Sequence, residues 1–116
     1  MKRRLMASIG VTATLAAAAV IAPATTASAH AACGTSVGDR DNSTWVSSAN
    51  GANIRTGSGT NCGARGVAYA SHRLDYHCYT VGNDGYTWTF VRNDTTGVTG
   101  WIRDDLLSDR GSNVPC

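Results

Sequence analysis

The sequence predicts an all-β fold, built from short strands and held together by two disulfides. Three observations predict it. Short segments with alternating apolar and polar residues recur between residues 53 and 103, and clusters of glycine, asparagine and aspartate separate them. Beyond residue 29 the chain has no lysine and no glutamate, which are strong helix formers. Four cysteines lie in the same part, an even number in a short chain.

Five strands are expected, with turn clusters between them. In chain order they cover residues 53–55, 66–70, 73–81, 86–92 and 98–103. The alternation is clearest in the third, where Leu74, Tyr76 and Cys78 should share one face of the sheet. Residues 104–107 suit a single helical turn. Five short strands of this kind are typical of a small barrel or a sandwich.

The first 29 residues have the three parts of a secretory signal peptide: a positive head, an apolar run at 5–21 and the small residues Ala27-Ser28-Ala29. We expect cleavage after Ala29; cleavage after Ala31 is the nearest alternative. A membrane anchor is disfavoured because the run is at the lower limit for spanning a bilayer. A lipid-modified Cys33 is disfavoured because His30 stands where lipoprotein signals have a leucine-like residue. The sequence therefore predicts an extracellular protein, free or associated with the cell wall, with no membrane contact after cleavage.

Cleavage would leave residues 30–116, enough for one domain. We divide this part into a polar N-terminal segment (30–50), a β domain (51–108) and a C-terminal tail (109–116) tied by Cys116. It has seven arginines and eight aspartates, a net charge of −1, whereas the whole chain has +2. Nucleic-acid binding through a basic patch is therefore not expected.

The cysteines Cys33, Cys62, Cys78 and Cys116 read as two disulfides in an exported domain. Three pairings are open from sequence alone. We favour Cys33–Cys116, joining the two ends, and Cys62–Cys78, closing a local loop. Each would stabilise the fold by about 3–5 kcal/mol.

A metal site is not expected. His72, His77 and Cys78 lie close in sequence but lack the usual ligand spacings. In a regular strand His77 and Cys78 point to opposite faces. The histidines are therefore interpreted as surface residues on one strand face, and we predict no cofactor.

Two segments resemble the bacterial Src-homology-3 family. Residues 53–57, Asn-Ile-Arg-Thr-Gly, match its opening N-[VI]-R-[ST]-G motif. Residues 88–92, which begin Trp-Thr-Phe-Val, match a W-x-x-V strand, and Thr-Gly-Trp-Ile at 99–102 matches the closing T-G-W-[VI] strand. The resemblance covers about residues 50–108 and implies a five- to six-stranded β barrel at 51–108 that binds peptidoglycan peptides or other short peptides. The chain departs from the pattern at Ser58, where the family has proline, and in Cys62 and Cys78.

A binding module of this kind needs exposed aromatic side chains beside polar loops. The candidate ligand-binding residues are Asn53, Thr60, Asn61, Tyr69, Tyr79, Tyr86 and Trp88. For Trp88, a place in the core and a place in a binding groove are equally compatible with the sequence.

Catalysis is not expected, because residues 30–116 contain no glutamate, no cysteine expected to be free and no G-x-S-x-G motif. The favoured function is a secreted, non-catalytic and monomeric module that recognises cell-wall peptidoglycan peptides or another short peptide. The alternative is an exported effector or inhibitor that acts on a secreted protein partner.

Overall fold

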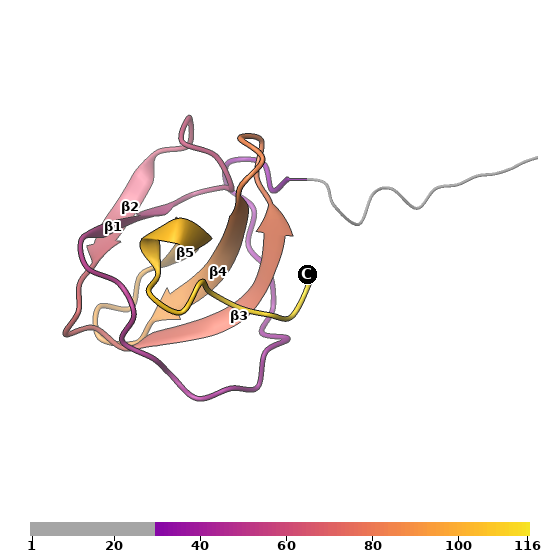
Figure 1. The fold of residues 1–116 in the computed structure, drawn as a ribbon. Coiled ribbons are helices and arrows are strands. Elements are labelled where there is room, and N and C mark those ends of the chain that lie inside the picture. The colour runs from indigo at the N-terminus through magenta and orange to yellow at the C-terminus, as the bar shows by residue number, and fades with distance from the viewer. Residues whose placement is uncertain (1–29) are drawn as a thin grey trace, which may run out of the picture.

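A computed structural model describes residues 30–116; the expected signal peptide, 1–29, lies outside the described residues. The fold is all-β, with five strands in one antiparallel sheet (Figure 1). The strands are β1 (Ala52–Arg55), β2 (Ala64–Ala68), β3 (Leu74–Val81), β4 (Thr87–Asn93) and β5 (Thr99–Arg103). Their order across the sheet is β2-β1-β5-β4-β3, so β2 and β3 form its two edges. A 3₁₀ turn, η3 (Asp104–Leu106), follows β5.

The five strands lie where alternation and turn residues predicted them, with ends shifted by one or two residues. The turns use the expected local chemistry. Between β3 and β4, Asp84 Oδ1 accepts the amide of Tyr86 at 3.0 Å. Between β4 and β5, Asn93 Oδ1 accepts the amide of Thr95 at 3.0 Å, and Gly97 supplies a φ of 82°. These side chains hold each reversal locally, which is why the sequence located the turns well.

Apolar side chains pack on both faces of the sheet. The larger cluster consists of Ala49, Ala52, Ile54, Ala68, Leu74, Tyr76, Val91, Ile102 and Leu107. On the other face Trp88, Phe90 and Trp101 form a second cluster, with Ala31 and Val37 of the N-terminal segment packed against it. The indole N–H of Trp101 donates to the carbonyl oxygen of Thr35 at 2.9 Å. The start of the N-terminal segment thus covers this second face, whereas Val46 and Ala49, near its end, pack on the first.

Strand β3 has an irregularity that the alternation did not predict. Its register against β4 shifts between Tyr76 and Cys78, so His77 is an extra residue. Cys78 pairs with Phe90, and the His77 ring lies 5.3 Å from the Phe90 ring. His77 and Cys78 therefore lie on the same side, and Cys78 does not share a face with Tyr76. The prediction of a surface histidine is wrong for His77, which is 8% exposed.

The outer edge of β3, which no other strand of the sheet pairs with, is covered near both ends by irregular segments of the chain. The N-terminal segment pairs with it through an antiparallel bridge between Val46 and Leu74. The tail pairs with it through a parallel bridge between Tyr79 and Pro115. Unpaired edge strands invite association with other chains, so this cover blocks a route to aggregation.

The disulfides join Cys33 to Cys62 and Cys78 to Cys116. All four cysteines are paired, but the predicted pairing is wrong. The tail returns along β3 and places Cys116 beside Cys78, whereas the start of the N-terminal segment lies against the 56–63 loop. There the amide of Gly34 donates to the carbonyl of Thr56 at 2.8 Å. No helix within residues 30–116 is long and apolar enough to cross a membrane.

Candidate functional site

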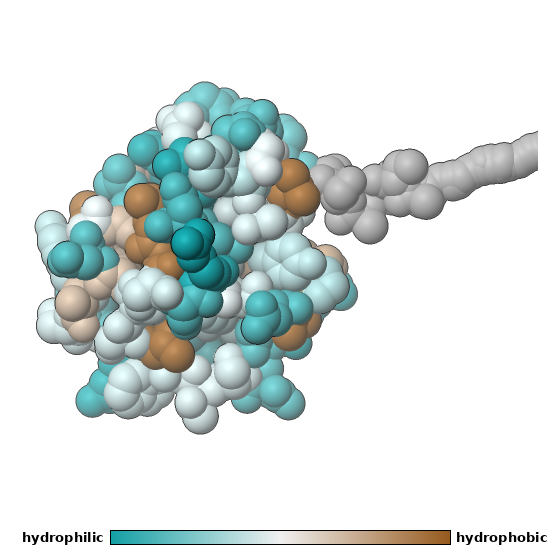
Figure 2. Space-filling model, viewed as in Figure 1, coloured by the Kyte–Doolittle hydropathy of each residue, from teal (hydrophilic) through white to brown (hydrophobic). Residues whose placement is uncertain are grey.

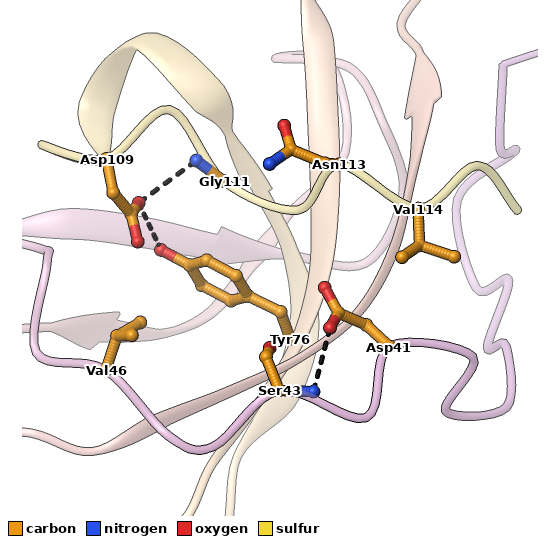
Figure 3. Close-up of a pocket in the computed structure, with 8 residues that line it drawn as sticks. All are labelled: Asp41, Ser43, Val46, Tyr76, Asp109, Gly111, Asn113 and Val114. Atoms are coloured by element: carbon orange, nitrogen blue, oxygen red, sulfur yellow. Dashed lines mark hydrogen bonds between the residues drawn. The ribbon is translucent and has the colours of Figure 1, made fainter.

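A pocket of about 290 Å³ lies where three segments meet: the N-terminal segment, β3 and the tail (Figure 3). Its lining residues are Asp41, Ser43, Val46, Tyr76, Asp109, Gly111, Asn113 and Val114. Figure 2 shows this side of the molecule, where the tail runs, as mostly hydrophilic or neutral with small separate apolar patches.

The tail forms its wall of the pocket by a tight turn. Arg110 and Gly111 both have left-handed backbones, with φ of 68° and 79°. A non-glycine residue rarely adopts this conformation, so Arg110 is held there by its surroundings. At Gly111 a Cβ would lie 2.3 Å from Thr89 Oγ1 and 2.4 Å from Asp104 Oδ1, so a side chain has no room. The turn brings residues 112–114 back against the sheet.

A chain of buried polar groups fixes that position. Thr89 Oγ1 donates to Asp104 Oδ1 at 2.6 Å and accepts the amide of Ser112 at 3.0 Å. Ser112 Oγ donates to Asp41 Oδ2 at 2.7 Å and accepts the amide of Val114 at 3.0 Å. The chain links η3, β4, the tail and the N-terminal segment. Each buried polar group in it has a partner, as a stable network requires.

Tyr76 and Asp109 form one side of the pocket. The Tyr76 hydroxyl donates to Asp109 Oδ1 at 2.7 Å and is also hydrogen-bonded to the hydroxyl of Ser48. Burial raises the pKa of Tyr76 far above its ordinary value, and its bond to Asp109 acts in the same direction. Tyr76 is therefore a neutral donor at physiological pH. The amide of Gly111 donates to the same Asp109 oxygen at 3.1 Å.

Asp41 lies on another side. Burial acts to raise the pKa of its carboxyl, but hydrogen bonds from Ser43 and Ser112 outweigh burial and hold that pKa below its ordinary value. Asp41 is thus a carboxylate at neutral pH. Within residues 30–116, no ion pair joins Asp41 or Asp109 to a basic side chain. The pocket therefore presents uncompensated negative charge beside the apolar side chains of Val46 and Val114.

None of the seven candidate residues from the sequence lines this pocket. Trp88 is in the core, 1% exposed, with its indole N–H donating to Asp84 Oδ1 at 3.1 Å. Of the two places that the sequence allowed for Trp88, the core and a binding groove, the structure shows the core. Tyr79 is partly buried and pairs with the tail through its backbone.

The other five candidates are exposed but dispersed. Asn53 lies on β1, and Thr60 and Asn61 lie in the loop that follows it. Tyr69 is 51% exposed and lies 5.5 Å edge-on from His72. Tyr86 is 48% exposed and lies 4.3 Å from the Arg103 guanidinium. Asn61 accepts a hydrogen bond from Asn83 at 3.1 Å and donates one to Cys33 Sγ at 3.9 Å.

Sequence reasoning missed Asp41 and Asp109 because it assigned aspartates to turn geometry. Both do have that role, since Asp41 accepts the amide of Ser43 and Asp109 accepts the amide of Gly111. The pattern gave no sign that the two turns meet. Comparison of the chain with protein-family models, curated proteins and solved structures finds no match.

Proposed function

We propose that this chain is a secreted, non-catalytic binding module whose pocket holds a positively charged amine of a short peptide. The ligand class that the family resemblance implies, the peptides of cell-wall peptidoglycan, is part of the proposal, as is the Src-homology-3-like arrangement of the sheet.

The observation that carries the proposal is the pair of carboxylates, Asp41 and Asp109, in one pocket without a basic partner in the described chain. An ammonium group has three donors and suits acceptors that converge from different sides. Charge-assisted hydrogen bonds to carboxylates are about twice as strong as neutral ones. The Asn113 side chain, also in the lining, offers a further amide oxygen.

Size limits what enters. A volume of about 290 Å³ lies just below the usual range of ligand pockets, which is roughly 300–1,000 Å³. The pocket accordingly takes one side chain or one terminal group, with the rest of the peptide over the surface. Val46 and Val114 would pack on the methylene groups of an amine-bearing side chain, which combine an apolar stem with a charged head.

Calorimetry with a charge-matched pair of peptides tests this function. The probe is a short peptide with blocked ends and one lysine; its control carries acetyl-lysine and differs only in the lost charge. We expect saturable binding of the first and none of the second. Asp109→Asn should abolish binding while keeping the acceptor for the Gly111 amide. Asp105→Asn, which also removes one carboxylate but pairs with Arg103 at 2.7 Å outside the pocket, should bind normally.

Co-sedimentation with purified peptidoglycan then tests the source of the peptide. Pelleting that Asp109→Asn abolishes supports the cell wall. If the protein binds the lysine peptide but does not pellet with peptidoglycan, the amine-binding role of the pocket is supported and the cell wall is excluded as the source of the ligand. Equal binding of both peptides would overturn the role of charge.

One observation favours the alternative, an exported effector that binds another protein. Trp45 is 49% exposed, with the Arg73 guanidinium 4.8 Å from its ring centroid. Exposed tryptophan and arginine are common at the centres of protein interfaces. If Trp45→Ala abolishes capture of a secreted protein while the lysine peptide still binds, the effector function is supported as a second activity, independent of the pocket.

A further inference from the structure

A second polar cluster lies on the same β3 edge but outside the pocket. It consists of Asp39 from the N-terminal segment and Asp75 and His77 from β3. One ligand atom from each residue lies within 4.8 Å of the other two. Asp39 is exposed, Asp75 is partly buried and His77 is buried. The cluster is thus open to solvent on one side and closed on the other.

His77 has one ring nitrogen engaged and one without a hydrogen bond. Nδ1 lies 3.1 Å from the carbonyl oxygen of Val37, a geometry in which Nδ1 carries the proton and donates it. In the neutral ring with this tautomer, Nε2 carries the lone pair. It is buried and has no hydrogen-bond partner within the described part of the chain. An unsatisfied buried nitrogen is costly, so it points to a missing partner.

Asp75 lies beside that nitrogen but does not satisfy it. Asp75 Oδ2 is 3.7 Å from His77 Nε2, which is too long for a hydrogen bond. The same oxygen lies 3.3 Å from the Arg92 guanidinium. Arg92 also contacts Asp94 through Nε at 2.6 Å, so it has a second partner if Asp75 turns towards a cation.

We propose that Asp39, Asp75 and His77 bind a divalent transition-metal ion, for which Zn²⁺ is the best match. One imidazole and two carboxylates suit Zn²⁺, whereas Ca²⁺ and Mg²⁺ prefer oxygen ligands. A histidine that binds metal through one nitrogen commonly donates its other N–H to a carbonyl or carboxylate, as His77 does to Val37. Water would complete the four-coordinate shell on the exposed side.

The donor atoms need a modest contraction. Tetrahedral zinc separates its ligand atoms by about 3.4 Å, from bonds of about 2.1 Å. The present separations reach 4.8 Å. Rotation of the Asp39 side chain, the most exposed of the three, would contribute to this contraction. The ion would join the N-terminal segment to β3 close to the hydrogen bond from the Arg40 amide to the His77 carbonyl, 2.9 Å.

Calorimetric titration of the oxidised protein with zinc chloride tests the site. The key variant is Asp39→Asn, which removes a ligand charge at an exposed position and keeps the acceptor for the Asp41 amide, 3.0 Å away. The control is Asp94→Asn, which removes an exposed carboxylate that contacts the same Arg92. We expect one Zn²⁺ per chain, with affinity at least about tenfold weaker in Asp39→Asn and unchanged in Asp94→Asn.

Nitrogen NMR of the histidine rings locates the ion independently of affinity. Zinc should shift His77 Nε2 in the wild-type protein, and the same zinc concentration should raise the melting temperature less in Asp39→Asn than in the wild type. Three results would each overturn the proposal: no saturable zinc binding, equal weakening in both variants, or shifts confined to His30 and His72. A His77 ring protonated on both nitrogens and indifferent to zinc would instead establish an ion pair with Asp75.

Discussion

Removal of each disulfide separately is expected to destabilise the protein equally but to affect ligand binding unequally. Cys78–Cys116 spans 38 residues and Cys33–Cys62 spans 29. The chain-entropy relation gives a stabilisation of about 4 kcal/mol for either bridge at 25 °C, with a difference of about 0.2 kcal/mol between them. Replacing both cysteines of one bridge by alanine should therefore lower the free energy of unfolding by nearly the same amount in the two variants.

Binding should separate the two variants. Cys116 anchors the end of the tail, and the tail supplies Gly111, Asn113 and Val114 to the pocket. If loss of Cys78–Cys116 leaves the tail docked in about a tenth of the molecules, the apparent affinity for the lysine peptide falls about tenfold. Loss of Cys33–Cys62 should leave that affinity unchanged. That bridge ties the first residues of the N-terminal segment to the 56–63 loop, whereas backbone hydrogen bonds of Arg40 with His77 and of Val46 with Leu74 hold the part of the segment that lines the pocket.

The assays are urea unfolding for stability and calorimetry for binding, with dispersed amide NMR signals as the check that each variant is folded. Equal losses of affinity in the two variants would refute the reasoning. So would full binding after removal of the tail bridge in a protein that remains folded.

Three further changes test the fold, two of them beside the pocket and one at the turn between β3 and β4. Thr89→Val should lower the free energy of unfolding, measured by urea denaturation, by about 3 kcal/mol. The change leaves the buried Ser112 amide without an acceptor and removes a hydrogen bond to Asp104. A loss below about 1 kcal/mol would contradict this. Burial raises the pKa of Asp104 above its ordinary 3.8. At neutral pH the ionised carboxyl therefore lowers the free energy of unfolding, and this penalty disappears as the pH falls through the raised pKa towards 3.8. Asp104→Asn should therefore melt higher than wild type at pH 7 and match it near pH 3.8, and a pH-independent difference would be inconsistent with that origin. Gly82→Ala should destabilise by about 2 kcal/mol in thermal unfolding, because its Cβ would lie 2.2 Å from Trp88 Nε1, and unchanged stability would show that the contact relaxes freely.

The strands were predictable because their signals are local. Alternation and turn residues act over a few positions, and the turns at 82–85 and 93–97 are held by their own side chains. The β3 bulge was not predictable, because strict alternation has no place for the extra residue His77. That one residue moves Cys78 to the other face and makes His77 buried.

The candidate site was not predictable because it depends on contacts distant in sequence. Ser112 and Asp41 are 71 residues apart and meet only when the tail folds back on β3. The disulfide pairing failed for the same reason. Trp88 was ambiguous because its burial depends on the start of the N-terminal segment, where Ala31 and Val37 pack on its cluster, and the polar composition of residues 30–50 gave no sign of that packing.

Amide NMR during titration with the lysine peptide tests the central claim most directly, because it identifies the surface that the ligand contacts. The pocket predicts that the largest shifts occur at Ser43, Gly111, Asn113 and Val114, from both the N-terminal segment and the tail. Shifts centred on Asn53, Thr60 and Tyr69, or no saturable shifts at all, would contradict it.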